Sequence, residues 1–196
     1  NISGLRLFNS LNMTMSLTSG GGFLPSDSIK NIIETNFQKL VFIFSLLVSM
    51  LNFYLLFNIL NKKTLLKEHR EDLYLLILTI ILFALIYFNN YKGLDIIASV
   101  ISSIANSGLT LVNTNNNLSL YFLLLTIIGG SLISNTSGIK LTRFYILLKI
   151  TSSEIIKLIS PNSIINKSIF GSDKKISDEN VKISFLIFIS FFFSLF

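Results

Sequence analysis

The longest uncharged stretch of the chain is IIASVISSIANSGLTLVNTNNNLSLYFLLLTIIGGSLISNTSGI at residues 96–139, between Asp95 and Lys140, and the expected fold follows from it. One bilayer crossing needs roughly 20 apolar residues, so this stretch is too long for a single helix. A short apolar run ends near Gly108, and polar residues at 113–117 precede a second apolar run. The pattern predicts a re-entrant segment, which enters the membrane part-way and turns back, followed by a spanning helix.

The composition indicates a membrane protein. Of 196 residues, 51% are hydrophobic and 13% are charged, against about 25% charged in a typical soluble domain. Two further uncharged stretches, Leu40–Asn61 and Leu73–Tyr91, are long enough to cross a bilayer. We therefore expect an all-α integral membrane protein. The chain has no Cys and one His, which excludes thiolate catalysis and Cys-based metal sites. We expect no catalytic residues, no resident metal centre and no cofactor.

The re-entrant pattern occurs twice. The earlier copy, SLNMTMSLTSGGGFLPSDS at residues 10–28, is also a short apolar run that ends in glycines. In both copies a polar outer segment, a spanning helix and a basic loop follow, over about residues 5–62 and 94–149. Repeats with the same orientation imply a pseudo-rotational axis along the membrane normal, with a pore on the axis. The alternative is that the glycines only let helices pack closely.

The two glycine turns have the chemistry of a cation filter. A cation that leaves water needs oxygen ligands, and backbone carbonyls provide them without a fixed charge that would trap it. Glycine permits the backbone conformations that such a turn requires. No acidic or basic residue occurs inside the predicted spans, which argues against a proton-pumping or respiratory-chain subunit.

Basic residues predict the orientation. Four of them lie at 62–70 and eight at 140–182, whereas the opposite side has only Arg6, Lys30, Lys39 and Lys92. The positive-inside rule therefore places the two rich loops in the cytoplasm and both glycine turns outside. Binding of these loops to anionic lipid or RNA is the alternative interpretation; we expect contact with membrane lipid and none with nucleic acid.

The segment from the second glycine pair onward resembles the TrkH/KtrB family of bacterial potassium-uptake membrane subunits. The matching residues are Gly129, Gly130, Ser134, Gly138, Lys140, Arg143, Pro161, Asn162 and Gly171. The resemblance implies tandem helix–pore-loop–helix units around a pseudo-fourfold pore, of which this chain is an internal fragment. It implies a second unit at 1–62, a third at 63–150, a cytoplasmic connector at 151–182 and the start of a fourth unit's outer helix at 183–196.

The resemblance also implies particular site residues. The filter strands, which would bind K⁺ as the transported ion, correspond to Ser19, Gly20, Gly21 and Gly22 and to Ala105, Asn106, Ser107 and Gly108. A gate that breaks the third unit's inner helix corresponds to Gly130, Ser131, Ser134, Asn135, Thr136 and Gly138. Lys140 and Arg143 correspond to a basic pair with a gating or an anchoring role.

The implied function is K⁺ uptake across the bacterial inner membrane, by a multi-pass homodimer with a cytosolic nucleotide-binding regulatory subunit. A Na⁺-preferring or Na⁺/H⁺-coupled relative of the same fold is the alternative.

Overall fold

The computed structural model describes residues 4–26, 28–61, 69–88, 93–112, 116–161, 168–171 and 175–195. The basic residues at 62–67, most of the polar string after Val112, and Asn162 lie outside these ranges. Within them the chain is helical and has no strand, apart from an isolated bridge between Ser168 and Lys175. The all-α expectation is therefore confirmed.

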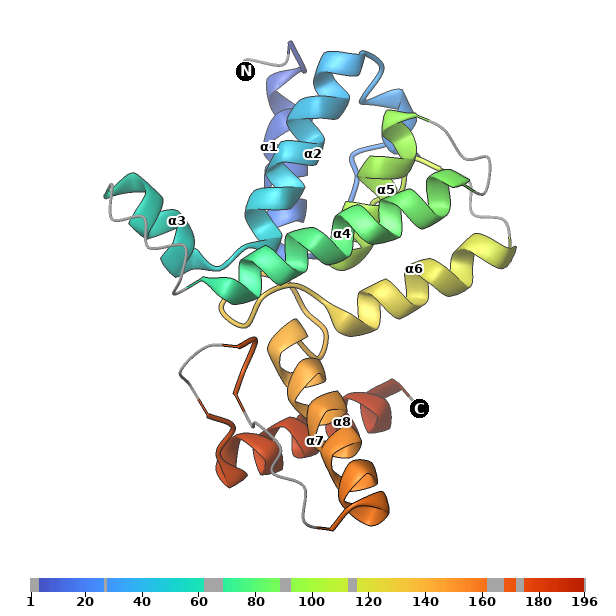
Figure 1. Ribbon diagram of the computed structural model, residues 1–196. Helices are drawn as coiled ribbons and strands as arrows, with labels where there is room; N and C mark the ends of the chain where they lie inside the picture. The colour runs from blue at the N-terminus through green and yellow to red at the C-terminus, as the bar shows by residue number, and fades with distance from the viewer. Residues whose placement is uncertain are drawn as a thin grey trace.

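The helices follow one another as shown in Figure 1. They are α1 (Leu7–Ser19), the 3-10 turn η1 (Ile29–Asn31), α2 (Asn36–Met50), α3 (Phe53–Leu60), α4 (Arg70–Phe88), α5 (Leu94–Ile104), α6 (Asn116–Ile128), α7 (Leu141–Ile159) and α8 (Asp178–Leu195). Helix α7 continues beyond residue 150, and α8 begins before Ile183, so both helices extend into the predicted connector.

The expected continuous span Leu40–Asn61 is wrong. The helix ends at Met50 and resumes as α3 at Phe53, with a bend of 108° between the two axes. Among the described helices, none is by itself both long enough and apolar enough to cross a membrane, and the bent pair of α2 and α3 meets that standard only jointly. Figure 1 shows α3 projecting sideways from the end of α2.

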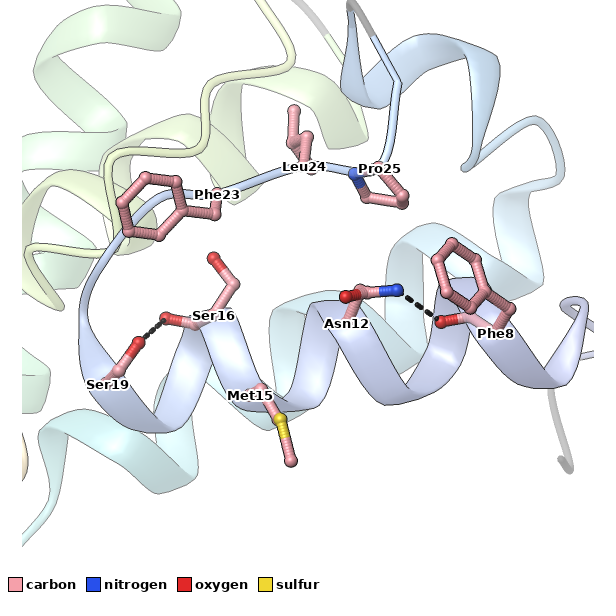
Figure 2. A pocket seen from close by; sticks show the side chains of 8 residues that line it. All are labelled: Phe8, Asn12, Met15, Ser16, Ser19, Phe23, Leu24 and Pro25. Carbon is pink, nitrogen blue, oxygen red and sulfur yellow. Dashed lines mark hydrogen bonds between the residues drawn. The ribbon is translucent and has the colours of Figure 1, made fainter.

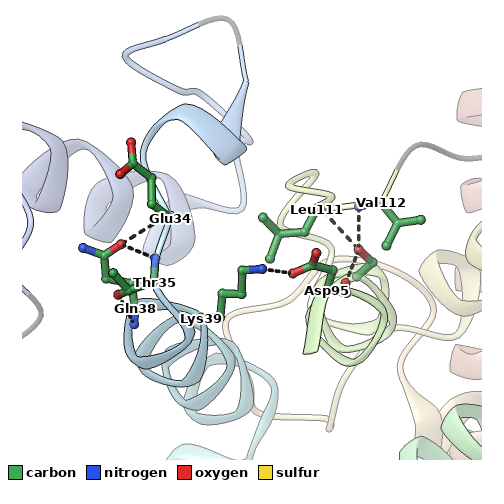
Figure 3. A network of polar contacts seen from close by, with 8 residues as sticks. Glu34, Thr35, Gln38, Lys39, Asp95, Leu111 and Val112 are labelled. Atoms are coloured by element: carbon green, nitrogen blue, oxygen red, sulfur yellow. Dashed lines mark hydrogen bonds and ion pairs between the residues drawn. The ribbon is translucent and has the colours of Figure 1, made fainter. Parts of the chain in front are cut away.

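Helix α5 is the centre of the packing, because it lies against α2, α4 and α6. Its buried residues are Ile96, Ala98, Ser99, Val100, Ile101, Ser102, Ser103 and Ile104. An ion pair of 2.6 Å between Lys39 Nζ and Asp95 Oδ1 joins the first turns of α2 and α5 (Figure 3). Asp95 also places a negative charge at the N-terminus of α5, where the helix dipole favours it.

A capping box begins α2 and fixes its entry angle. The Thr35 hydroxyl accepts a hydrogen bond from Gln38 N, and the Gln38 side chain accepts from the backbone N–H groups of Glu34 and Thr35 (Figure 3). These bonds satisfy backbone donors that a helix N-terminus otherwise leaves unpaired.

An aromatic stack holds the segment 168–171 against α4 and α7. The Phe170 ring lies 5.0 Å from the ring of Tyr74 and 4.3 Å from the ring of Tyr145, measured between centroids. Arg70 donates to the carbonyl oxygens of Phe170 and Gly171. The stack therefore joins three segments that are distant in the sequence.

We predict that Phe170→Ala lowers the free energy of unfolding by about 3 kcal/mol, because it leaves a cavity between two aromatic rings. Phe193→Ala is the control, since this α8 side chain is 85% exposed, and its effect should stay within about 0.5 kcal/mol. Thermal or denaturant unfolding of the purified protein in detergent measures both. Equal losses in the two variants would contradict the role of the stack.

Candidate functional site

The two short helices that precede the glycine turns end in the same way. At the end of α1 the N–H of Gly21 donates to Ser16 O at 3.2 Å, and at the end of α5 the N–H of Ser107 donates to Ser102 O at 3.1 Å. The residue before each donor, Gly20 or Asn106, is left-handed, with φ of +64° and +53°. This is the Schellman cap, in which Gly and Asn are the usual left-handed residues.

The similarity continues one step past the caps. Gly22 and Gly108 are also left-handed, with φ of +67° and +70°. Each turn thus has two left-handed residues separated by one that is not, Gly21 in the first turn and Ser107 in the second. L-residues with large side chains avoid this conformation, which explains the residue types here. The two turns of the predicted repeat therefore share one backbone conformation.

The two turns contact each other backbone to backbone. A Cβ atom added to Gly22 would lie 3.1 Å from Ser107 O and 3.4 Å from the Cα of Gly108. A Cβ added to Gly108 would lie 3.4 Å from the Cα of Gly22, and one on Gly20 would lie 3.5 Å from Asn106 O. The candidate filter residues of the two units therefore lie side by side.

Serine hydroxyls of α5 support the second turn and the extended chain after it. Ser102 Oγ shares a hydrogen bond of 2.7 Å with Ser107 Oγ and donates to Leu109 O. Ser99 Oγ accepts from the N–H groups of Leu111 and Val112, at 3.1 and 3.3 Å (Figure 3). The sequence analysis missed these two supporting serines; polar residues at i and i+3 on an apolar helix were the available signal.

In the first turn the supporting hydroxyl is that of Ser19, which accepts from Gly21 N at 3.2 Å. Ser16 corresponds to Ser102, but its buried hydroxyl has no hydrogen-bond partner among the described residues. Figure 2 shows the hydroxyl of Ser16 directed from α1 toward the segment that runs from Phe23 to Pro25. It borders a cavity of about 340 Å³ lined by Phe8, Asn12, Met15, Ser16, Ser19, Phe23, Leu24 and Pro25.

All the candidate gate residues lie in one loop, residues 129–140, that separates α6 from α7. Backbone bonds hold the ends of this loop together: Ile139 N donates to Ile127 O at 3.0 Å, and Leu141 N donates to Gly130 O at 3.1 Å. Inside the loop, the Thr136 hydroxyl accepts from Gly130 N. The structure thus places an interruption between α6 and α7 that extends slightly beyond the candidate gate residues, which run from Gly130 to Gly138.

The loop touches both glycine turns. The side-chain amide of Asn135 donates to Thr18 O, immediately before the first turn. Gly138 lies against the second turn, because a Cβ added to it would lie 3.1 Å from Asn106 Nδ2. Asn106 Nδ2 in turn donates to Thr126 O on α6 at 3.0 Å. The candidate filter and the candidate gate therefore form one connected site.

The unexpected break between α2 and α3 lies against this loop. Ser131 N donates to Met50 O at 3.1 Å, and Phe53 N donates to Ile133 O at 2.9 Å. Each break thereby satisfies backbone groups that the other leaves unpaired. Asn52, inside the expected span, instead precedes α3, where its side chain accepts from Tyr54 N as the N-cap.

Two acidic residues at the start of α4 complete the pairing, and the sequence analysis assigned them no role. Asp72 Oδ1 accepts from Asn52 N at 2.9 Å, and Glu71 Oε1 accepts from Leu132 N at 2.7 Å. Both precede the uncharged stretch Leu73–Tyr91. Burial raises the pKa of both carboxyls above the ordinary range, and the hydrogen bonds from these backbone amides oppose that rise.

His69, the residue before α4, is largely buried. Its side chain is 10% exposed, its Nδ1 lies 3.7 Å from Asp72 Oδ2, and its Nε2 shares a hydrogen bond with the Asn58 amide. Lys140 also points inward, toward the oxygens of Ser134 and Thr136. Arg143 lies in the first turn of α7 and is partly exposed.

The comparison with solved structures shows which known fold this arrangement of helices has. The chain superposes on the crystal structure of the potassium transporter TrkH from Vibrio parahaemolyticus with a TM-score of 0.81 and 19% identity, covering 96% of this chain and 43% of that one. The chain thus has the TrkH fold, and the resemblance noted in the sequence is confirmed at this level.

A sequence relative points the same way. A protein of Methanocaldococcus jannaschii, named as an uncharacterized cation transporter, is 31% identical over 169 residues, which are 83% of this chain and 34% of the relative. The chain thus spans about a third of that relative's length. No protein-family model matches the sequence. Similarity to transporters indicates a membrane protein.

We predict that Gly22→Ala destabilises the protein more than Gly4→Ala does. Both glycines have positive φ, +67° and +71°, but a Cβ on Gly22 meets Ser107 O at 3.1 Å, whereas one on Gly4 meets nothing within 4 Å. The Gly4 variant measures backbone strain alone, about 1 kcal/mol, and Gly22 should cost at least about twice that. Unfolding temperatures in detergent decide the matter, and equal shifts would contradict the close contact of the turns.

Proposed function

We propose that this chain forms part of the permeation path of a membrane protein that takes up K⁺. The observation that supports this proposal most strongly is the pair of facing turns, which share one backbone conformation and meet without intervening side chains. The names of the two similar proteins, a potassium transporter and a cation transporter, favour the same class of function.

The proposed filter works through neutral oxygens. None of Ser19–Gly22 or Ala105–Gly108 is charged, so a cation beside the turns would be coordinated by carbonyl and hydroxyl groups. The C-termini of α1 and α5 end at the turns, where the helix dipole contributes a partial negative charge. Together these features attract a monovalent cation without holding it as tightly as a carboxylate would.

The proposed gate is the loop 129–140. It contacts the residue before the first turn and a residue within the second, so a displacement of the loop would open or close the path next to the filter. Lys140 and Arg143 flank the start of α7, where they could transmit a movement of that helix to the loop.

For the whole protein we further propose that it resides in a bacterial inner membrane, forms a homodimer and is controlled by a cytosolic nucleotide-binding subunit. A preference for Na⁺ would retain the same architecture.

The test is rubidium uptake by cells that lack their own potassium importers and express the complete natural gene product. We expect growth at low external K⁺ and saturable uptake. Gly108→Ser should abolish both while the protein remains in the membrane, because the side chain would enter the contact with Gly22. Gly4→Ser is the matched control, because Gly4 has φ of +71° and open space around it, and it should retain uptake.

Uptake of Na⁺ without rubidium would replace the proposed ion and keep the path. Absence of any flux, including after co-expression of a nucleotide-binding subunit, would overturn the proposal. Undiminished rubidium uptake in Gly108→Ser would overturn the filter assignment.

A further inference from the structure

The ammonium group of Lys140 is buried in a pocket of neutral oxygens. The residue is 9% exposed. Its Nζ lies 3.2 Å from both Ser134 O and Ser134 Oγ and 3.1 Å from Thr136 Oγ1, and it also donates to Thr136 O. Three N–H groups thus face four oxygens from two residues of the candidate gate. We call these four oxygens the Ser134–Thr136 cage.

The cage has the ligands of a K⁺ site rather than those of a salt bridge. Among the described residues, no carboxylate forms an ion pair with Lys140; Glu71 attracts the ammonium only from a greater distance. Carbonyl and hydroxyl oxygens replace the hydration shell of K⁺ in selective filters, and an ammonium ion is close to K⁺ in size. The cage is therefore suited to either cation.

The backbone at Lys140 is strained, so the contacts of its ammonium group must offset an unfavourable backbone conformation. Lys140 has φ of +75° with ψ of 137°, a combination that is unfavourable for a residue with a Cβ. Glycine would adopt it without that penalty. Residues in such conformations persist when the surrounding contacts outweigh the strain, and here the contacts are those of the ammonium with the cage.

The cage also lies next to the proposed permeation path. Asn135, between the two cage residues, donates to Thr18 O beside the first turn. Gly138, between the cage and Lys140, lies against Asn106 of the second turn. Hydrogen bonds within the cage, such as the 2.8 Å contact between the hydroxyls of Ser134 and Thr136, keep its oxygens together.

We propose that the Ser134–Thr136 cage is a monovalent-cation site, which the Lys140 ammonium occupies in this structure as a tethered competitor of the free ion. This inference rests on the proposed function for its biological role, since the competing ion would be the transported one. With Lys140 in the cage, the loop is fastened against both turns. When a free cation replaces it, the side chain is released and α7 is free to move away from the loop.

The test compares Lys140→Gly and Lys140→Met with the wild type and with Lys157→Met. Lys157 is the matched control, because its side chain is 39% exposed and pairs with Glu154 on the same helix. Unfolding temperatures of the purified full protein are measured in detergent at constant ionic strength, in choline chloride and with increasing KCl, NH₄Cl or NaCl.

In choline we expect both Lys140 variants to unfold about 5 °C below the wild type, because cage oxygens lose their donors. Lys140→Gly should show this loss even though it relieves the left-handed backbone. KCl and NH₄Cl should then stabilise the two Lys140 variants more than they stabilise the wild type or Lys157→Met. NaCl should stabilise the two Lys140 variants less than KCl does.

If Lys140→Gly is as stable as the wild type, or more stable, the ammonium does not stabilise the protein through the cage, and the proposal is overturned. Equal stabilisation of all variants by KCl would overturn the cation site. If neither Lys140 variant can be purified, Ser134→Ala decides, since it removes one cage oxygen: a smaller loss in choline supports the cage, and wild-type stability contradicts it. None of these readouts requires transport. A failure of rubidium uptake would therefore overturn the proposed function without contradicting the cation site.

Discussion

The structure depends on the pairing of backbone groups at two helix breaks. A helix that ends inside an apolar environment leaves donors and acceptors that water cannot reach, and each costs free energy unless it finds a partner. Here Met50 O pairs with Ser131 N, Phe53 N pairs with Ile133 O, and the carboxylates of Asp72 and Glu71 accept from Asn52 N and Leu132 N. Because the backbone groups at the two breaks pair with each other, a continuous helix across one break would leave the backbone groups of the other break without partners.

This pairing positions the candidate site. The interruption between α6 and α7 gives the loop 129–140, which reaches both glycine turns through Asn135 and Gly138. Helix α5 fixes the second turn from the other side, through the hydroxyls of Ser99 and Ser102. The loop, the turns and α5 therefore form one unit, in which a displacement of any part must change hydrogen bonds in the others.

The sequence predicted the parts of the site whose cause is local. Glycines after short apolar runs located both turns, because glycine reports backbone conformation directly, and the resemblance to the TrkH/KtrB family located the break before α7. The break after Met50 has no such signal: Leu51 and Asn52 are neither Gly nor Pro, and the stabilising carboxylate of Asp72 is distant in the sequence. The inward direction of Lys140 likewise depends on the folded loop, since a lysine near a helix start is normally read as an exposed anchor.

The central claim is that the facing turns at Ser19–Gly22 and Ala105–Gly108 coordinate a monovalent cation. The most direct measurement is anomalous diffraction from crystals of the complete protein grown in rubidium chloride. We expect an anomalous peak beside both turns, within coordination distance of their carbonyl oxygens. Ordered turns without a peak, in crystals that show rubidium bound elsewhere on the protein, would contradict it.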